Sequence, residues 1–160
     1  MGAGLRRSEV EALDLSDYDR ATGALTVRNG KGNKARTAYA TNGSRDALEA
    51  WIAARGTAPG PLFMPVLKNG AIARRRLSDE AIWGTLNKRA RQSGIAKLSP
   101  HDLRRTFISQ LLDAGADLVS VQHLAGHATV TTTSRYDRRG EAAKLKAAEL
   151  LHVPYIGRLP

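Results

Sequence analysis

Apolar residues recur every three or four positions through most of the chain, which is the period of an amphipathic helix. The pattern begins with Leu5, Val10 and Leu13 and predicts a helix over residues 5–14. Further along, it predicts helices that open at a polar capping residue and close at a glycine. These helices begin near Ser44, Ser78, Ser99-Pro100 and Asp117, and they end near Gly56, Gly94, Gly115 and Gly126.

The apolar stripes of these helices identify the candidate core. In chain order they contain Leu48, Trp51 and Ile52, then Ile82, Leu86 and Ala90, then Leu103, Phe107 and Leu111, then Leu118, Val121 and Leu124. Thr129 to Thr133 provide capping residues for a segment that holds Tyr136. A last amphipathic helix is expected over residues 141–152, with Ala143, Ala147, Leu150 and Leu151 on its apolar face.

Residues 24–40 follow a different period. Leu25 and Val27 alternate with polar residues, and Thr37 and Tyr39 repeat the alternation after a run that tolerates positive φ, Asn29-Gly30-Lys31-Gly32-Asn33. This pattern is typical of a β-hairpin. Residues 57–70 contain three prolines and two glycines and are expected to form a loop. The sequence therefore predicts an α+β fold, a mostly helical domain with one small antiparallel sheet.

The charge balance points to a polyanionic partner. The chain has 25 Lys and Arg against 15 Asp and Glu, a formal net charge of +10, although a solvated basic surface would give the same count. Cysteine is absent, which removes disulfides and thiolate metal sites. No apolar run reaches the roughly 18 residues that a bilayer span requires. We therefore expect a cytoplasmic protein that does not bind membranes.

Two segments carry candidate chemistry. His101 and Arg104 are three residues apart on one predicted helix, where an imidazole and a guanidinium could bind a phosphodiester. The alternative is a histidine at a helix start beside solvated arginines. Gly126 should end a helix and leave His127 on a turn, and Tyr136 follows His127 by nine residues.

Tyr136 lies among cationic residues, namely Arg135, Arg138 and Arg139. A phenol surrounded by cations loses its proton more easily than an isolated one, which is what a nucleophile requires. An ordinary half-buried tyrosine near a basic surface is the alternative interpretation.

The motifs together resemble a known family. His101-Asp102-Leu103-Arg104, then Leu124-Ala125-Gly126-His127, then Tyr136, are similar to the C-terminal signature of tyrosine recombinases, the phage integrase family. Residues 4–9, Gly-Leu-Arg-Arg-Ser-Glu, are similar to the family's Gly-Leu-Arg-x-Ser-Glu motif, so that Arg6 matches a catalytic arginine. Residues 30–36 are similar to its Gly-Lys-Gly-Asn-Lys hairpin, so that Lys31 matches the catalytic lysine.

The resemblance implies an integrase-like (DNA breaking-rejoining enzyme) fold and a transesterification that needs no metal or nucleotide cofactor. Tyr136 would attack phosphorus and form a 3′-phosphotyrosine. Arg6 and Arg104 would hold the non-bridging oxygens and His127 would add a donor, while Lys31 would protonate the departing 5′ oxygen and His101 would help to move the tyrosine proton. Glu9 and Asp102 would hold neighbouring basic groups in place.

The implied partner is double-stranded DNA. Basic residues outside the catalytic set are candidate backbone contacts, and equally candidate solvated surface: Lys34, Arg74, Arg75, Arg76, Lys88, Arg89 and Arg91. Full-length members of the family form tetramers on DNA, and a free fragment would be a monomer or dimer. The helix over residues 141–152 would dock either on its own domain or on a neighbouring protomer.

The resemblance further implies that residues 1–160 form a recombinase catalytic domain, N-terminally truncated and without the family's core-binding domain. We therefore expect a prokaryotic or phage-encoded, nucleoid-associated enzyme for site-specific recombination. Two alternatives remain open from the sequence, a type IB topoisomerase that relaxes DNA and a DNA-binding remnant that no longer cuts.

Overall fold

The computed structural model describes residues 2–28, 35–152, 154–155 and 157, and at residue 142 it describes the backbone only. The predicted turn at residues 29–33, together with Lys31 and Lys34, lies outside the described residues. Within them the chain is mostly helical with one small antiparallel sheet, which confirms the predicted fold class. Every helix in the described part of the chain is too short or too polar to span a bilayer.

The sheet has the strand order β1-β2-β3, with β1 (Tyr18–Asp19), β2 (Ala24–Val27) and β3 (Arg36–Tyr39). Leu25 pairs with Ala38 across β2 and β3, and both side chains are buried on the same face. The hairpin and the alternation of Leu25 and Val27 in β2 are therefore confirmed. In β3 the predicted phase is wrong, because Thr37 and Tyr39 are exposed and Ala38 between them is buried. Strand β1 was not predicted, because two residues are too few to display a period.

One hydrophobic core lies between the sheet and the helices of the N-terminal half. Helix α1 (Arg7–Ala12) and a short 3₁₀ helix, η1 (Leu15–Asp17), precede the sheet, and α2 (Gly43–Arg55) packs over it. Leu48 and Ile52 of α2 are buried there beside Leu62, and the Trp51 indole donates a hydrogen bond of 2.8 Å to the Leu62 carbonyl. The loop over residues 57–70 is present as expected.

Two helix boundaries in this half differ from the prediction. Helix α1 is shorter than residues 5–14, because the chain turns extended at Leu13. Helix α2 begins at Gly43 and not after a cap at Ser44, because the chain enters it through Asn42 at a φ of 49°. Asparagine tolerates this left-handed conformation better than most residues, which allows the earlier start.

A second core belongs to the C-terminal half. Helix α4 (Pro100–Asp113) opens with a capping box in which Ser99 and Asp102 exchange hydrogen bonds, so Asp102 serves mainly as a cap. Helix α5 (Leu118–Ala125) begins after Asp117, and the short α6 (Val130–Ser134) packs against α5. Ile108, Leu112, Val121 and Ala125 form this core, separate from the first.

The face that helix α4 buries most deeply is not the one predicted. We expected Leu103, Phe107 and Leu111 to form the core stripe; Phe107 and Leu111 do pack against the second core, but all three are only half-buried. The deeply buried positions are Ile108 and Leu112, with Arg104 in the same row. The apolar period alone cannot place an arginine on the buried face, because its partners come from other parts of the chain.

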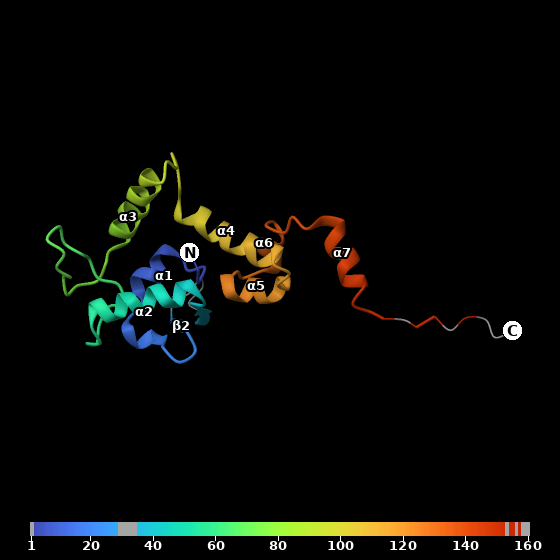
Figure 1. Ribbon diagram of the computed structural model, residues 1–160, viewed down its shortest axis with the longest axis horizontal. Coiled ribbons are helices and arrows are strands. Elements are labelled where there is room, and N and C mark those ends of the chain that lie inside the picture. The colour runs from blue at the N-terminus through green and yellow to red at the C-terminus, as the bar shows by residue number, and fades with distance from the viewer. Residues whose placement is uncertain (1, 29–34, 153, 156, 158–160) are drawn as a thin grey trace.

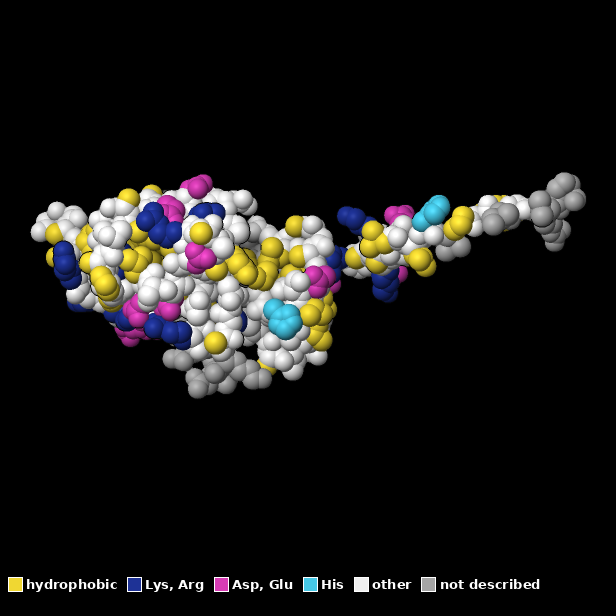
Figure 2. Space-filling model, turned by 90° about the horizontal axis from the view of Figure 1, so that it is seen from below, with side chains coloured by type: hydrophobic (Ala, Val, Ile, Leu, Met, Phe, Trp, Pro, Cys, Tyr) yellow, Lys and Arg dark blue, Asp and Glu magenta, His cyan; other side chains and the backbone are white. Residues whose placement is uncertain are grey.

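The remaining helices extend away from these cores. Helix α3 (Asp79–Gln92) is capped by Ser78 as predicted and packs against α1. Helix α7 (Gly140–Ala148) projects from the body (Figures 1 and 2), and it is shorter than the predicted 141–152. Of its predicted apolar face, Ala147, Leu150 and Leu151 are exposed and Ala143 is half-buried, so this face is largely open.

Candidate active site

Arg6 and Glu9 form the first part of the site, at the start of α1. The Glu9 carboxylate accepts from the Arg6 guanidinium at 2.6 Å and from the Arg6 backbone N–H at 2.7 Å. Glu9 is only 4% exposed, and a buried carboxylate requires such partners. These contacts agree with the role expected for Glu9 from the sequence, which is to hold a neighbouring basic group in place.

Arg36 is a member of this cluster that the sequence analysis did not select. It stands at the start of β3, and its Nη2 donates to Glu9 at 2.7 Å. Its Nε and Nη1 are buried and have no hydrogen-bond partner among the described residues. Burial lowers the pKa of Arg36, which the charge of Glu9 partly opposes. The only sequence signal was its position at the end of the Gly-Lys-Gly-Asn-Lys match.

Arg104 approaches the same place from α4. It is buried, and its guanidinium donates to the backbone carbonyls of Gly4 and Ala125. Burial, with the nearby charge of Arg6 as the next cause, lowers its pKa to about 10. The side chain therefore remains cationic at neutral pH, and it is held by neutral partners within the described residues.

Two glycines allow these arginines to come together. Gly126 ends α5 at a φ of 60°, and its carbonyl accepts from Arg6 at 2.8 Å. A Cβ on Gly126 would lie 2.2 Å from the Nε of Arg36. Gly4, also at a φ of 60°, lies against the Phe107 ring, where a Cβ would meet it at 2.4 Å. Both sites require a left-handed backbone and leave no space for a side chain.

His127 and Tyr136 complete the site from the C-terminal half. The His127 Nδ1 and the Thr133 hydroxyl lie 2.9 Å apart. The rings of His127 and Tyr136 stack at 6.2 Å between centroids and 30° between planes. Burial, then the charges of Arg104, Arg6 and Arg36, lower the pKa of His127 to about 4, so the imidazole is neutral near pH 7.

The cation that lies over the Tyr136 ring is not one of the predicted flanking arginines. The Arg105 guanidinium carbon lies 6.0 Å from the ring centroid, a cation–π distance. Arg139 pairs with Asp137 at 2.8 Å, and Arg135 and Arg138 are exposed. His101 is exposed at the first turn of α4, close enough to act electrostatically on His127.

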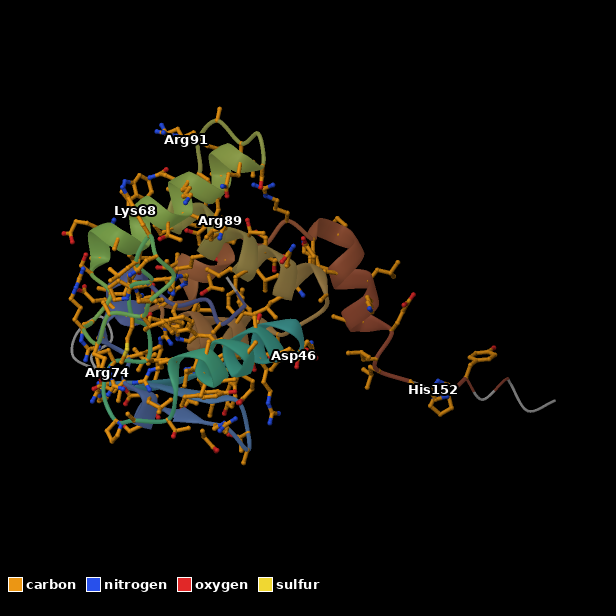
Figure 3. The ribbon with its side chains drawn as sticks, turned by 60° about the vertical axis from the view of Figure 1, so that its left-hand side comes forward. Asp46, Lys68, Arg74, Arg89, Arg91 and His152 are labelled. Atoms are coloured by element: carbon orange, nitrogen blue, oxygen red, sulfur yellow. The ribbon has the colours of Figure 1, made fainter. Side chains whose placement is uncertain are left out.

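The predicted DNA-contact residues are dispersed. Arg74 and Arg75 are exposed on the loop before α3, and Lys88 and Arg89 are exposed on α3 itself. Figure 3 shows Arg91 near the top of the view and Arg74 in its lower part. Arg76 instead bonds to the carbonyls of Glu11 and Leu13 and to Asp14, so its guanidinium holds the end of α1 in place.

The site can therefore bind an anion beside a phenol. Arg6, Arg36 and Arg104 gather around one buried carboxylate, Glu9, which leaves an excess of positive charge. Guanidiniums suit phosphate oxygens because each can donate two parallel hydrogen bonds. No cluster of three or more metal-ligating side chains occurs among the described residues.

Comparisons with known proteins agree on one family. A model of the phage integrase family matches residues 1–142. The chain is 42% identical over 141 residues to the tyrosine recombinase XerC of Azotobacter vinelandii, covering 84% of this chain and 44% of that protein. It is 34% identical over 137 residues to the tyrosine recombinase XerA of Pyrococcus furiosus, covering 86% and 46%. The chain thus spans less than half the length of these curated relatives.

Solved structures show the same fold. A crystal structure of XerA recombinase matches with a TM-score of 0.72 and 29% identity, covering 96% of this chain and 55% of that one. The XerH site-specific recombinase bound to its difH substrate, in a pre-cleavage complex, matches with a TM-score of 0.66 and 24% identity, covering 93% and 43%. The second likeness bears on the fold alone.

Proposed function

The chain belongs to the phage integrase family of tyrosine recombinases, and from that premise we propose that it cleaves and rejoins DNA strands in site-specific recombination. Residues 1–160 form the catalytic domain in this proposal. The observation that carries it is the convergence of Arg6 and Arg104 on the turn at Gly126, directly before His127. The topoisomerase and remnant alternatives are not favoured, because the similar proteins named above are recombinases.

The proposed reaction is a transesterification at one DNA phosphodiester. The Tyr136 oxygen bonds to phosphorus, the bond from phosphorus to the 5′ oxygen breaks, and a 3′-phosphotyrosine and a free 5′ hydroxyl result. The proton on Tyr136 passes to His101, and Lys31, which lies outside the described residues, supplies a proton to the 5′ oxygen. The ester keeps the energy of the original bond, so a 5′ hydroxyl from another strand reverses the step.

Charge accumulates on the non-bridging oxygens in the transition state. Arg6 and Arg104 are fixed by carbonyl and carboxylate partners before DNA arrives, so little reorganisation accompanies the reaction. The neutral imidazole of His127 adds one hydrogen-bond donor without adding charge. The cluster thus performs the stabilisation that a metal ion performs in other phosphoryl-transfer enzymes.

The proposed partner is double-stranded DNA, held along its backbone by the exposed Arg74, Arg75, Lys88 and Arg89, with Lys34 as a further contact. Arg76 is left out of this set, because its guanidinium is already bonded to Glu11, Leu13 and Asp14. Assembly into a tetramer on DNA is also proposed, with α7 docking on a neighbouring protomer. In support, Leu145 and Leu150 of this segment are 64% and 85% exposed, so the described residues of the domain leave these apolar side chains largely uncovered (Figure 2). DNA as the substrate would place the protein in the nucleoid.

A suicide substrate tests the proposal. Nicked duplexes with a randomised central region lose the short freed strand on cleavage, so a covalent protein–DNA adduct accumulates and survives denaturing gels. Wild type should form the adduct, and sequencing of the trapped DNA should return a preferred site. Tyr136→Phe, which removes one oxygen, should form none. An adduct with Tyr136→Phe, or its absence from wild type that binds DNA, contradicts the proposal.

A further inference from the structure

We propose that Thr133 is a positioning residue, whose hydroxyl holds His127 in the tautomer that carries its proton on Nε2 and presents it to the phosphate. This inference rests on the proposed function and assigns a role to a residue that the catalytic motif does not include. Thr133 acts through His127 and does not itself touch the DNA.

The contact is built into the interior. Thr133 is 0% exposed, and its hydroxyl lies 2.9 Å from the Nδ1 of His127. It makes no other side-chain hydrogen bond to the described residues. Leaving a buried hydroxyl without a hydrogen-bond partner lowers the free energy of unfolding by about 1–3 kcal/mol. The hydrogen bond to His127 avoids this cost for Thr133.

The tautomer matters because the imidazole is neutral. Arg104, Arg6 and Arg36 surround His127 with positive charge, and a neutral imidazole carries one proton on one of its two nitrogens. If Nδ1 carried the proton, Nε2 would turn a lone pair towards the phosphate oxygens and repel them. When Nδ1 accepts from Thr133, Nε2 must carry the proton and can donate it as a hydrogen bond.

The backbone around His127 leaves ring rotation as the remaining freedom. The Gln122 side chain donates to the His127 carbonyl at 3.1 Å, and the His127 N–H donates to the Gln122 carbonyl at 3.1 Å. These bonds fix the main chain and not the ring. The hydroxyl of Thr133 supplies a hydrogen bond that constrains the rotation of the imidazole, in addition to its stacking on Tyr136.

Thr133 also connects the donor with the nucleophile. Its carbonyl accepts from the Tyr136 N–H at 3.0 Å, and the Tyr136 ring stacks on His127. One residue therefore orients His127 through its side chain and anchors the turn to Tyr136 through its backbone. We expect the two groups to keep their relative placement whenever this segment moves.

Isosteric substitution tests the role of the hydroxyl. Thr133→Val keeps the shape and removes the oxygen, and Thr133→Ser keeps the oxygen. Thr131→Val is the matched control, since Thr131 is exposed on the same helix. In single-turnover cleavage we expect Thr133→Val to lose roughly 10–100-fold in rate, with DNA affinity unchanged, and both Thr133→Ser and Thr131→Val to stay near wild type. Equal losses for Thr133→Val and Thr133→Ser would overturn the proposal.

A double-mutant cycle separates positioning from general structural support. In a His127→Ala background, Thr133→Val should cause no further loss of cleavage, because the group it positions is gone. Multiplying losses would mean that Thr133 acts independently of His127, which contradicts the proposal.

The tautomer can be observed without DNA or activity. Nitrogen-15 NMR of the imidazole should show the Nε2-protonated form in wild type and in Thr133→Ser, and a mixture or the other tautomer in Thr133→Val. A wild type protonated on Nδ1 would end the inference while leaving the cleavage chemistry untouched. If Thr133→Val fails to fold, the wild-type spectrum and the serine variant still decide the question.

Discussion

The two arginines proposed to clamp the phosphate come from the two halves of the molecule, and they are held in opposite ways. Arg6, in the N-terminal half, pairs with the buried carboxylate of Glu9. Arg104, in the C-terminal half, contacts two neutral carbonyls within the described residues. The charge of Arg6 is therefore partly balanced by a direct ion pair before DNA binds, whereas Arg104 feels the Glu9 charge only at a distance and has no ion pair among the described residues. Arg104 should account for more of the attraction to phosphate.

The halves also differ in how they join. Each has its own hydrophobic core, and polar bonds to the opposite half cross between them. Arg104 reaches Gly4 in the N-terminal half, and Arg6 reaches Gly126 in the C-terminal half. The proposed phosphate site thus lies where the two halves meet. Substitutions in it should therefore affect both the cleavage rate and the free energy of unfolding.

The largest effect is expected for Arg104, the arginine whose partners are neutral carbonyls. Arg104→Ala should reduce single-turnover cleavage by about 10³-fold, the scale for losing a fixed donor to a developing negative charge. DNA binding should be largely retained, because many backbone contacts remain. Arg104→Lys should restore part of the rate but not the paired donation. A cleavage rate for Arg104→Ala within about tenfold of wild type would contradict the assigned role.

Glu9→Gln gives Arg6 a neutral partner in place of a carboxylate, so that both proposed phosphate-binding arginines are then held by neutral groups. The substitution leaves Arg6 and Arg36 without their shared carboxylate, and breaking such a buried pair costs about 3–5 kcal/mol. We expect a lower melting temperature that rises more steeply with added phosphate than in wild type, because an anion then replaces the carboxylate. Equal phosphate responses in the two proteins would show that Glu9 does not balance these charges.

Gly126→Ala tests how closely the two halves of the molecule pack against each other at Gly126. The new Cβ would strike Arg36 and require a left-handed backbone, and we expect a loss of about 2 kcal/mol or more in the free energy of unfolding. Gly115→Ala is the control, because Gly115 also has a positive φ but nothing lies within 4 Å of its Cβ position. It should lose only about 1 kcal/mol. The difference between the two variants, measured by urea titration, reports the contact with Arg36.

The last effect concerns pH. The pKa of His127 falls from 6.5 to about 4 on folding, so between those values the unfolded state binds a proton that the folded state does not. The contribution of the neutral His127 to the free energy of unfolding is fully present above pH 6.5 and is lost as the pH falls towards 4. His127→Asn should lose less stability than wild type between pH 7 and pH 4.5. Parallel curves for the two proteins would show that the positive surroundings of His127 have no such effect.

The sequence predicted most of the fold and the motif residues of the site, for reasons that also explain its errors. Hydrophobic period and capping residues are local signals, so α3, α4 and α5 and the hairpin were found. Arg104 was selected by spacing but assigned away from the core row, because its partner Gly4 lies 100 residues earlier. A contact at that separation leaves no local pattern.

Two other residues show the same limit. Arg36 follows a predicted motif, but its pairing with Glu9 joins β3 to α1 and appears only in three dimensions. Thr133 was treated as one of several capping threonines, although it alone among residues 131–133 is fully buried against His127. Residue type identified the candidates, and burial separated the important threonine from its neighbours.

The bond from Arg104 to the Gly4 carbonyl has a practical consequence for protein engineering. Gly4 lies against Phe107, and its carbonyl accepts from the guanidinium that we propose acts in catalysis, so the backbone at Gly4 is coupled to the proposed reaction centre. An affinity tag or a programmable targeting module joined near Gly4 would transmit any tension straight to that guanidinium. Fusion designs should therefore place a slack linker before residue 2 and leave residues 2–5 unaltered.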